Sequence, residues 1–61
     1  MTVRVLYHEE PEGWWAESPD VKGWSAAGQT YDEVRRLAEE GVRFALDDET
    51  VEIEHFVPAK R

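Results

Sequence analysis

Acidic side chains gather around one predicted turn, and carboxylates are groups that can act as general acids or hold a metal ion. Glu9, Glu10, Glu12 and Glu17 flank the segment from Glu10 to Gly13, whose proline and glycine predict a tight hairpin turn. Acids beside a turn commonly serve as solvated surface groups, and catalysis needs acids that converge on one position. We therefore expect no enzyme and no catalytic residues.

The two histidines, His8 and His55, are predicted near the ends of the first and last strands. If these strands are neighbours, the two rings would suit a zinc site completed by Glu10 or Glu54. Without a third fixed ligand, ordinary surface or interface histidines are the alternative, and the chain has no cysteine for a thiolate site. We expect neither a metal nor another cofactor, and the sequence has no glycine-rich phosphate loop or nucleophile elbow.

Two strands must position the side chains at this end of the chain. From Thr2 to Glu9, the side chains alternate between a mainly apolar side and a mixed side, as in a half-buried strand. One side carries Val3, Val5 and Tyr7, and the other carries Arg4, Leu6 and His8. After the turn, the aromatic residues of Trp14 to Glu17 predict a second strand and thus a β-hairpin. Adjacent residues of a strand point to opposite faces of the sheet, so the side chains of Trp14 and Trp15 lie on different faces. The pattern leaves open which of the two faces away from the helix.

The stretch from Ser18 to Thr30 turns the chain twice before a helix begins. Pro19 and Gly23 predict turns, and the Asp20 side chain is suited to capping one of them. Trp24 to Ala27, between two glycines, predicts a short strand. Thr30 and Glu33 then match a capping box, in which the Thr30 hydroxyl accepts the Glu33 N–H and the Glu33 carboxylate accepts the Thr30 N–H.

From Thr30 the apolar period becomes 3.6, which indicates a helix with one buried face. The expected core face comprises Tyr31, Val34, Leu37, Ala38, Gly41, Val42 and Ala45, with Phe44 and Leu46 at its margins. Gly41 suggests a close approach of the helix to the sheet, because glycine inside a helix costs about 1 kcal/mol relative to alanine. The acids 47–49 predict the helix end. Thr50 to Val57 predicts the last strand, Pro58 ends it, and Ala59 to Arg61 is expected to be a frayed tail.

The predicted order is β-β-β-α-β, an α+β two-layer sandwich with a mixed four-stranded sheet and one helix on one face, all within a single domain of residues 1–61. A helical crossover makes the last strand parallel to the first. One helix covers one face of such a sheet, so aromatic side chains remain on the other, and exposed patches of this kind usually mark contact sites. The expected partner or oligomer interface comprises Leu6, His8, Trp14, Trp15, Trp24 and Phe56.

The formal net charge of -7 repels phosphate backbones, so we expect no direct nucleic-acid binding and a preference for basic partners. No apolar run is long enough to span a membrane, and the first residues do not match a secretion signal, so we expect a cytoplasmic protein without membrane contact. A chain of 61 residues has a thin core, for which self-association as a dimer or higher oligomer is a common remedy.

The chain resembles the HicB-like antitoxin family, whose small domain is described as a partial RNase H-like fold. The resemblance covers nearly the whole chain and is carried by Tyr7 to Glu10, Glu12 to Glu17, Ser18-Pro19-Asp20 with Gly23, and Ser25 to Thr30 running into Glu33. The family pattern usually has a proline near Lys22 and often a cysteine near Trp24, and this chain has neither.

The resemblance implies an interaction protein that binds and neutralises a small basic HicA-type toxin that cleaves RNA. Longer family members carry a C-terminal DNA-binding segment, and this chain ends at Arg61, so we expect no separate DNA-binding domain. One alternative is an orphan homo-oligomeric interaction module without a toxin partner. A more remote alternative is a metal-dependent RNase H-like nuclease. The first strand argues against it, because Val3, Val5 and Tyr7 occupy the face on which such an active site needs an aspartate.

Overall fold

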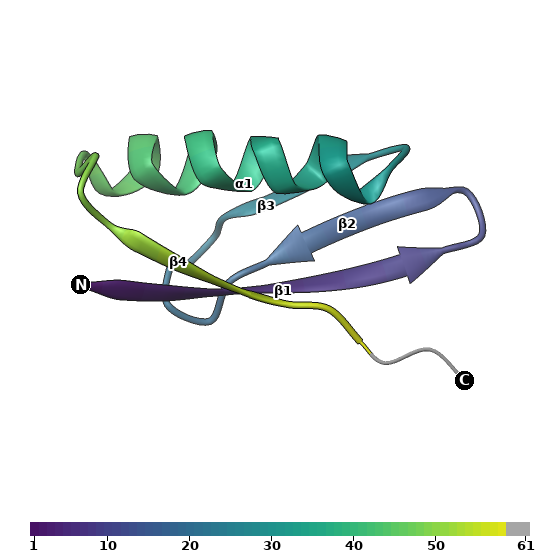
Figure 1. Ribbon diagram of the computed structural model, residues 1–61, viewed down its shortest axis with the longest axis horizontal. Helices are drawn as coiled ribbons and strands as arrows, with labels where there is room; N and C mark the ends of the chain where they lie inside the picture. The colour runs from purple at the N-terminus through teal and green to yellow at the C-terminus, as the bar shows by residue number, and fades with distance from the viewer. Residues whose placement is uncertain (59–61) are drawn as a thin grey trace.

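The computed structural model describes residues 1–58 and contains one four-stranded sheet and one helix (Figure 1). The elements are β1 (Thr2–Glu10), β2 (Gly13–Glu17), β3 (Ser25–Gly28), α1 (Tyr31–Leu46) and β4 (Glu52–Phe56). The strand order is β3-β2-β1-β4, with β4 parallel to β1 and the other pairs antiparallel. This confirms the predicted α+β order and the mixed sheet. The tail expected at 59–61 lies outside the described residues.

Helix α1 and the sheet form two layers, with the helix along one face of the sheet (Figure 1). The side chains between the layers are almost completely buried because β1, β2 and α1 each turn an apolar side inward. The buried apolar residues are Val3, Val5, Tyr7, Ala16, Val21, Val34, Ala38, Val42 and Val51. The opposite face of the sheet has no helix over it among residues 1–58, and we call it the uncovered face. No helix in this part of the chain is long and apolar enough to cross a membrane.

The buried face of α1 is narrower than the sequence predicts. Val34, Ala38 and Val42 are fully buried, and they follow one another at intervals of four residues. The prediction was wrong for Leu37, which is 40% exposed, and for Ala45, which is exposed. Because short strands offer a narrow surface, the helix buries little more than one residue per turn. Phe44, expected at the margin, is 88% exposed.

Both ends of α1 are capped by local hydrogen bonds. The Thr30 hydroxyl accepts the Glu33 N–H at 3.1 Å, as predicted. The Glu33 carboxylate accepts the Gln29 N–H at 3.0 Å instead of the Thr30 N–H, so that half of the predicted capping box was wrong by one residue. At the other end, Asp47 is left-handed with φ 53°, and the Asp48 N–H donates to the Arg43 carbonyl at 3.1 Å, which is a Schellman-type ending.

Gly41 makes the close contact that its place inside the helix suggested, with an indole rather than with the sheet. A Cβ atom at this position would lie 2.9 Å from Nε1 of Trp24, the residue just before β3. Trp24 is half-buried and packs against the core, outside the strand in which we expected it. The missing side chain of Gly41 therefore makes room for Trp24 on the helix.

Replacing Gly41 with leucine is expected to lower the melting temperature. A leucine side chain would need the space of the Trp24 ring, and overpacking of this kind costs about 1 to 3 kcal/mol. Most of this range exceeds the roughly 1 kcal/mol that the helix gains by losing a glycine. Thermal unfolding followed by circular dichroism measures the balance, and Glu40→Leu on the exposed side of the helix is the control. A melting temperature unchanged or raised in Gly41→Leu would show that Trp24 does not need this space.

Candidate functional site

The pairing of β1 with β2 decides which tryptophan faces outward. Trp15 lies opposite His8, whose side of β1 is turned away from the helix. The Trp15 and His8 rings stack with centroids 4.2 Å apart and planes 18° apart. Trp14 points to the other face, where its ring centroid lies 5.4 Å from that of Tyr31 on α1. The sequence left this choice open because adjacent strand residues are equivalent until the partner strand is known.

A patch of apolar and aromatic side chains therefore occupies one half of the uncovered face. It comprises Leu6, His8, Trp15 and Phe56, which we call the face patch. Leu6 lies opposite Phe56 on β4, as His8 lies opposite Trp15 on β2. Phe56 is 39% exposed, and the other members are half-buried. Leu6, His8 and Phe56 also line a shallow cleft together with Tyr7, Val57 and Pro58.

Carboxylates border the face patch and bind its polar atoms. His8 Nε2 lies 2.8 Å from Glu17 Oε2, and the Trp15 indole N–H donates to Glu10 Oε2 at 3.2 Å. Glu54 projects from the same face of β4, opposite Arg4 on β1. These contacts hold the two rings of the patch in place and surround it with negative charge. The hairpin acids were expected to be solvated turn residues, and only the pairing of β1 with β2 reveals that Glu10 and Glu17 contact the patch.

The structure brings together four of the six expected interface residues. Leu6, His8, Trp15 and Phe56 share the uncovered face. Trp14 and Trp24 lie on the other side of the sheet, half-buried against the core. Their indoles fill space beneath and beside the helix, so these two side chains are not available to the face patch.

Comparisons with protein-family models, with curated proteins and with solved structures find no match.

The two histidines lie on opposite faces of the sheet, so the arrangement considered for zinc was wrong. His55 pairs with Val5, on the helix side, whereas His8 belongs to the uncovered face. Within residues 1–58, no group of three histidine, aspartate or glutamate side chains is placed to hold a metal ion. The parallel pairing of β1 and β4 is as predicted, and the alternation along each strand separates the rings.

His55 makes one polar contact within the sheet and one with the helix. Its Nδ1 atom lies 2.6 Å from the Tyr7 hydroxyl, and its Nε2 atom lies 3.3 Å from Glu39 Oε2 on α1. Burial raises the pKa of Tyr7 to about 12, so this hydroxyl stays protonated and can donate to Nδ1. Burial also lowers the pKa of His55, and a neutral ring with its proton on Nε2 satisfies both partners. These groups tie β1, β4 and α1 together.

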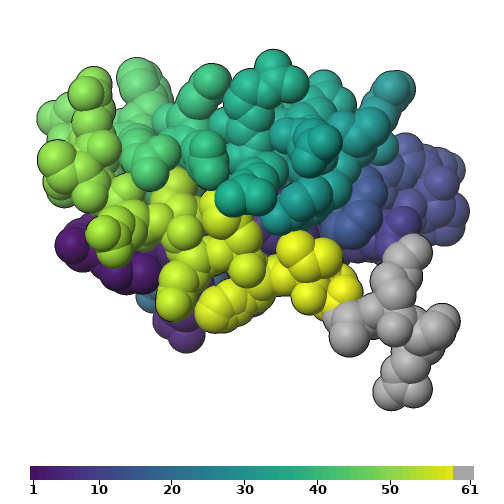
Figure 2. Space-filling view, viewed as in Figure 1, coloured from purple at the N-terminus to yellow at the C-terminus, as the bar shows by residue number. Residues whose placement is uncertain are grey.

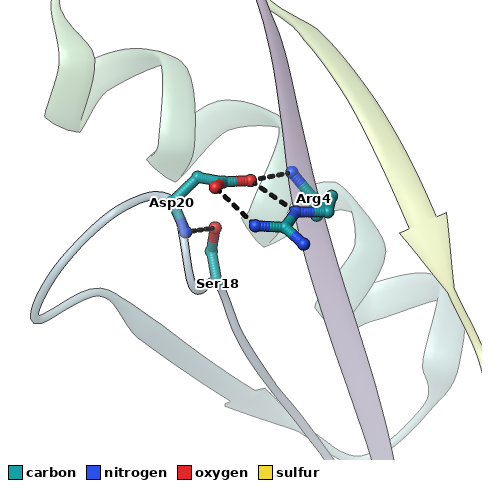
Figure 3. A network of polar contacts seen from close by, with 3 residues as sticks. All are labelled: Arg4, Ser18 and Asp20. Atoms are coloured by element: carbon teal, nitrogen blue, oxygen red, sulfur yellow. Dashed lines mark hydrogen bonds and ion pairs between the residues drawn. The ribbon is translucent and has the colours of Figure 1, made fainter.

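Arg4 and Asp20 form an ion pair with two parallel side-chain hydrogen bonds (Figure 3). The Arg4 backbone N–H and Nε both donate to Asp20 Oδ2, at 2.9 and 3.0 Å, and Arg4 Nη2 donates to Oδ1 at 2.9 Å. We expected the Asp20 side chain to cap a turn, and this was wrong. The Ser18 hydroxyl has that role, accepting the Asp20 N–H at 3.1 Å. Asp20 thereby fixes the loop between β2 and β3 to β1.

The Asp20 contact predicts a specific loss of stability in acid. Hydrogen bonds from Arg4 lower the pKa of Asp20 from its ordinary 3.8 to about 2. A carboxyl whose pKa is lower in the folded state stabilises the fold above the unfolded pKa and loses this effect as the pH falls through the folded pKa. We expect Asp20→Asn to lower the melting temperature at pH 7, with the gap to the wild type narrowing between about pH 4 and pH 2.

Melting curves from pH 7 to pH 2 test this expectation. Glu12→Gln, which neutralises an exposed acid in the hairpin turn, is the control. Its melting temperature should stay close to that of the wild type at each pH. A gap between wild type and Asp20→Asn that stays constant down to pH 2 would contradict the assigned role of the Asp20 charge.

Proposed function

We propose that this protein is a HicB-like, antitoxin-type interaction module that binds a small basic HicA-type toxin and blocks its cleavage of RNA. The observation that carries the proposal is the uncovered sheet face, on which an apolar patch is bordered by carboxylates. A partial RNase H-like domain of this family would have the β-β-β-α-β order, and that order is the one found here. The family assignment itself rests on the sequence motifs quoted above.

Charge supports a basic partner for this surface. The chain carries a net charge of -7, and Glu10, Glu17 and Glu54 border the face patch. Complementary charge increases the rate of encounter and disfavours acidic partners, while buried aromatic side chains supply most of the affinity in many interfaces. A small basic RNA-cleaving protein would supply the complementary charge, since its RNA site must itself attract phosphates.

Co-expression with any small basic protein encoded beside this chain tests the proposal. The expected result is a complex that survives purification, together with loss of the neighbour's RNA cleavage when this chain is added in equimolar amount. RNA cleavage that continues at saturating concentrations of this chain would overturn the proposal, as would a genomic neighbourhood without any such small basic protein.

A homo-oligomeric module is the second candidate, favoured by the exposed Phe56 in a chain with a thin core. Two copies joined through the uncovered face would bury both patches, but they would also bring their acidic borders together. Sedimentation at micromolar concentration distinguishes the candidates. The antitoxin proposal requires no dimer, whereas the oligomer candidate requires one that Phe56→Ser disrupts.

A further inference from the structure

β4 forms one edge of the sheet, and among residues 1–58 no strand pairs with its outer side. The Glu52 N–H donates inward to the Met1 carbonyl at 3.0 Å. Because backbone groups alternate in direction along a strand, the N–H and C=O groups of Ile53 and His55 point outward. In Figure 2 the yellow atoms of this segment lie at the surface facing the viewer, below the helix, with no other segment in front of them. Such an edge is a template for another extended chain.

The outer edge of β4 has a defined beginning and end. Before β4, Arg43 Nε donates to the Val51 carbonyl at 3.1 Å, so the side chain of α1 occupies the edge there. Beyond β4, Phe56, Val57 and Leu6 line the shallow cleft on the uncovered face. The available edge therefore spans Glu52 to Phe56 and leads into an apolar depression.

The two sides of this edge differ in charge. On the uncovered face, Glu52 and Glu54 are exposed and alternate toward Phe56. On the helix side, Arg35 Nε lies 3.5 Å from Glu39 Oε2, and Arg43 also projects toward β4. An added strand would accordingly place cationic side chains beside the glutamates and apolar side chains on the helix side, beside Ile53 and His55.

A second copy of this chain fits the edge poorly. In a two-fold antiparallel pairing centred on Glu54, that residue would face itself, and centring on Ile53 would place Glu52 opposite Glu54. Centring on His55 would avoid these clashes but would pair Glu54 with Phe56 and use only the end of the strand. Like charges directly opposite each other destabilise a strand pair, whereas opposite charges stabilise it. The glutamates thus disfavour pairing between copies while they attract a strand that carries lysine or arginine.

We propose that the outer edge of β4 binds an extended basic segment of another protein as an additional strand. Cationic residues of the segment lie beside Glu52 and Glu54, and an apolar residue enters the cleft at Leu6, Phe56 and Val57. This is a binding mode separate from the face patch, and it holds whichever protein supplies the segment. Backbone hydrogen bonds supply the affinity, and the alternation of side chains supplies the selectivity.

A capped peptide with the order Ser-Leu-Val-Lys-Val-Lys-Ser is the probe, since antiparallel addition places its leucine beside Phe56 and its lysines beside the glutamates. NMR titration of the labelled protein at low ionic strength should shift amide signals of residues 53–57 and slow hydrogen exchange at Ile53 and His55. Two control peptides are derived from this sequence. In one the valines are N-methylated, which removes the donors to β4, and in the other the residue order is scrambled; neither should bind.

Charge reversal at the edge is compared with the same reversal elsewhere. We expect Glu54→Lys to weaken peptide binding by about fivefold or more, because an opposite-charge neighbour becomes a like-charge one. Glu12→Lys, in the hairpin turn, changes the net charge by the same amount as Glu54→Lys and should weaken peptide binding less. Binding that survives N-methylation, equal effects of the two reversals, signal changes centred on β3 or the hairpin, or no binding at millimolar peptide would each overturn the proposal.

Discussion

Replacing Tyr7 with alanine is expected to destabilise the domain by about 3 to 5 kcal/mol, the usual cost of truncating a buried aromatic side chain. Tyr7 is 1% exposed, and its ring packs edge-on against Tyr31 with centroids 5.0 Å apart. Stabilities near 0.05 to 0.15 kcal/mol per residue give a 61-residue domain only about 3 to 9 kcal/mol in total. Tyr7→Ala should therefore lose a large part of this stability, as measured by urea titration and circular dichroism.

Tyr7→Phe separates the packing of the ring from its hydrogen bond. The phenylalanine keeps the ring in the core but removes the hydroxyl that lies 2.6 Å from His55 Nδ1. Loss of one such bond costs about 1 kcal/mol. If Tyr7→Ala were no less stable than Tyr7→Phe, the core would not be built around this side chain, and the arrangement of β1 against α1 described above would be wrong.

The second large effect is expected at Gly13, the first residue of β2. A Cβ atom there would lie 2.5 Å from the Gly28 carbonyl oxygen, and the φ angle of Gly13 is +157°. The obstacle is backbone of β3, which cannot move aside without separating the strands. We expect Gly13→Ala to cost about 2 to 3 kcal/mol, at the upper end of typical overpacking, and to lower the melting temperature measured by calorimetry.

Gly23→Ala is the matched control for Gly13→Ala. Gly23 has a φ of +80°, but a Cβ atom there would meet nothing within 4 Å. Its cost should be limited to the backbone strain of about 1 kcal/mol that a left-handed residue carries. A larger loss of stability at Gly23 than at Gly13 would contradict the close approach of β2 and β3.

The order of elements could be predicted because each has a clear local pattern. The alternation from Val3 to Tyr7 and the 3.6-residue period after Thr30 each require only neighbouring residues to be interpreted. The same patterns predicted that one sheet face would stay without a helix. Leu6, His8 and Phe56 were therefore expected on that face and lie there, whereas the choice between Trp14 and Trp15 stayed open.

The errors concern contacts between residues distant in sequence. Asp20 binds Arg4, 16 positions earlier in the chain. β2 ends before it reaches Arg4, and the Asp20 carboxylate accepts the Arg4 backbone N–H in place of a β2 carbonyl. Trp24 fills the space left by Gly41, and this fixes the indole on the helix side. Such contacts depend on register and loop path, which periodicity does not encode. The choice between Trp14 and Trp15 has the same origin.

We propose that the face patch, and not the exposed apolar residues of the helix, binds the basic partner. Two phenylalanines offer a matched pair, since Phe56 belongs to the patch and Phe44 lies on the helix at 88% exposure. Isothermal titration of the co-purified basic partner into Phe56→Ser and Phe44→Ser distinguishes the two surfaces. We predict that Phe56→Ser weakens binding by at least about tenfold, as truncation of an interface anchor commonly does, and that Phe44→Ser leaves the affinity unchanged. Equal affinities for the two variants, or a loss confined to Phe44→Ser, would contradict it.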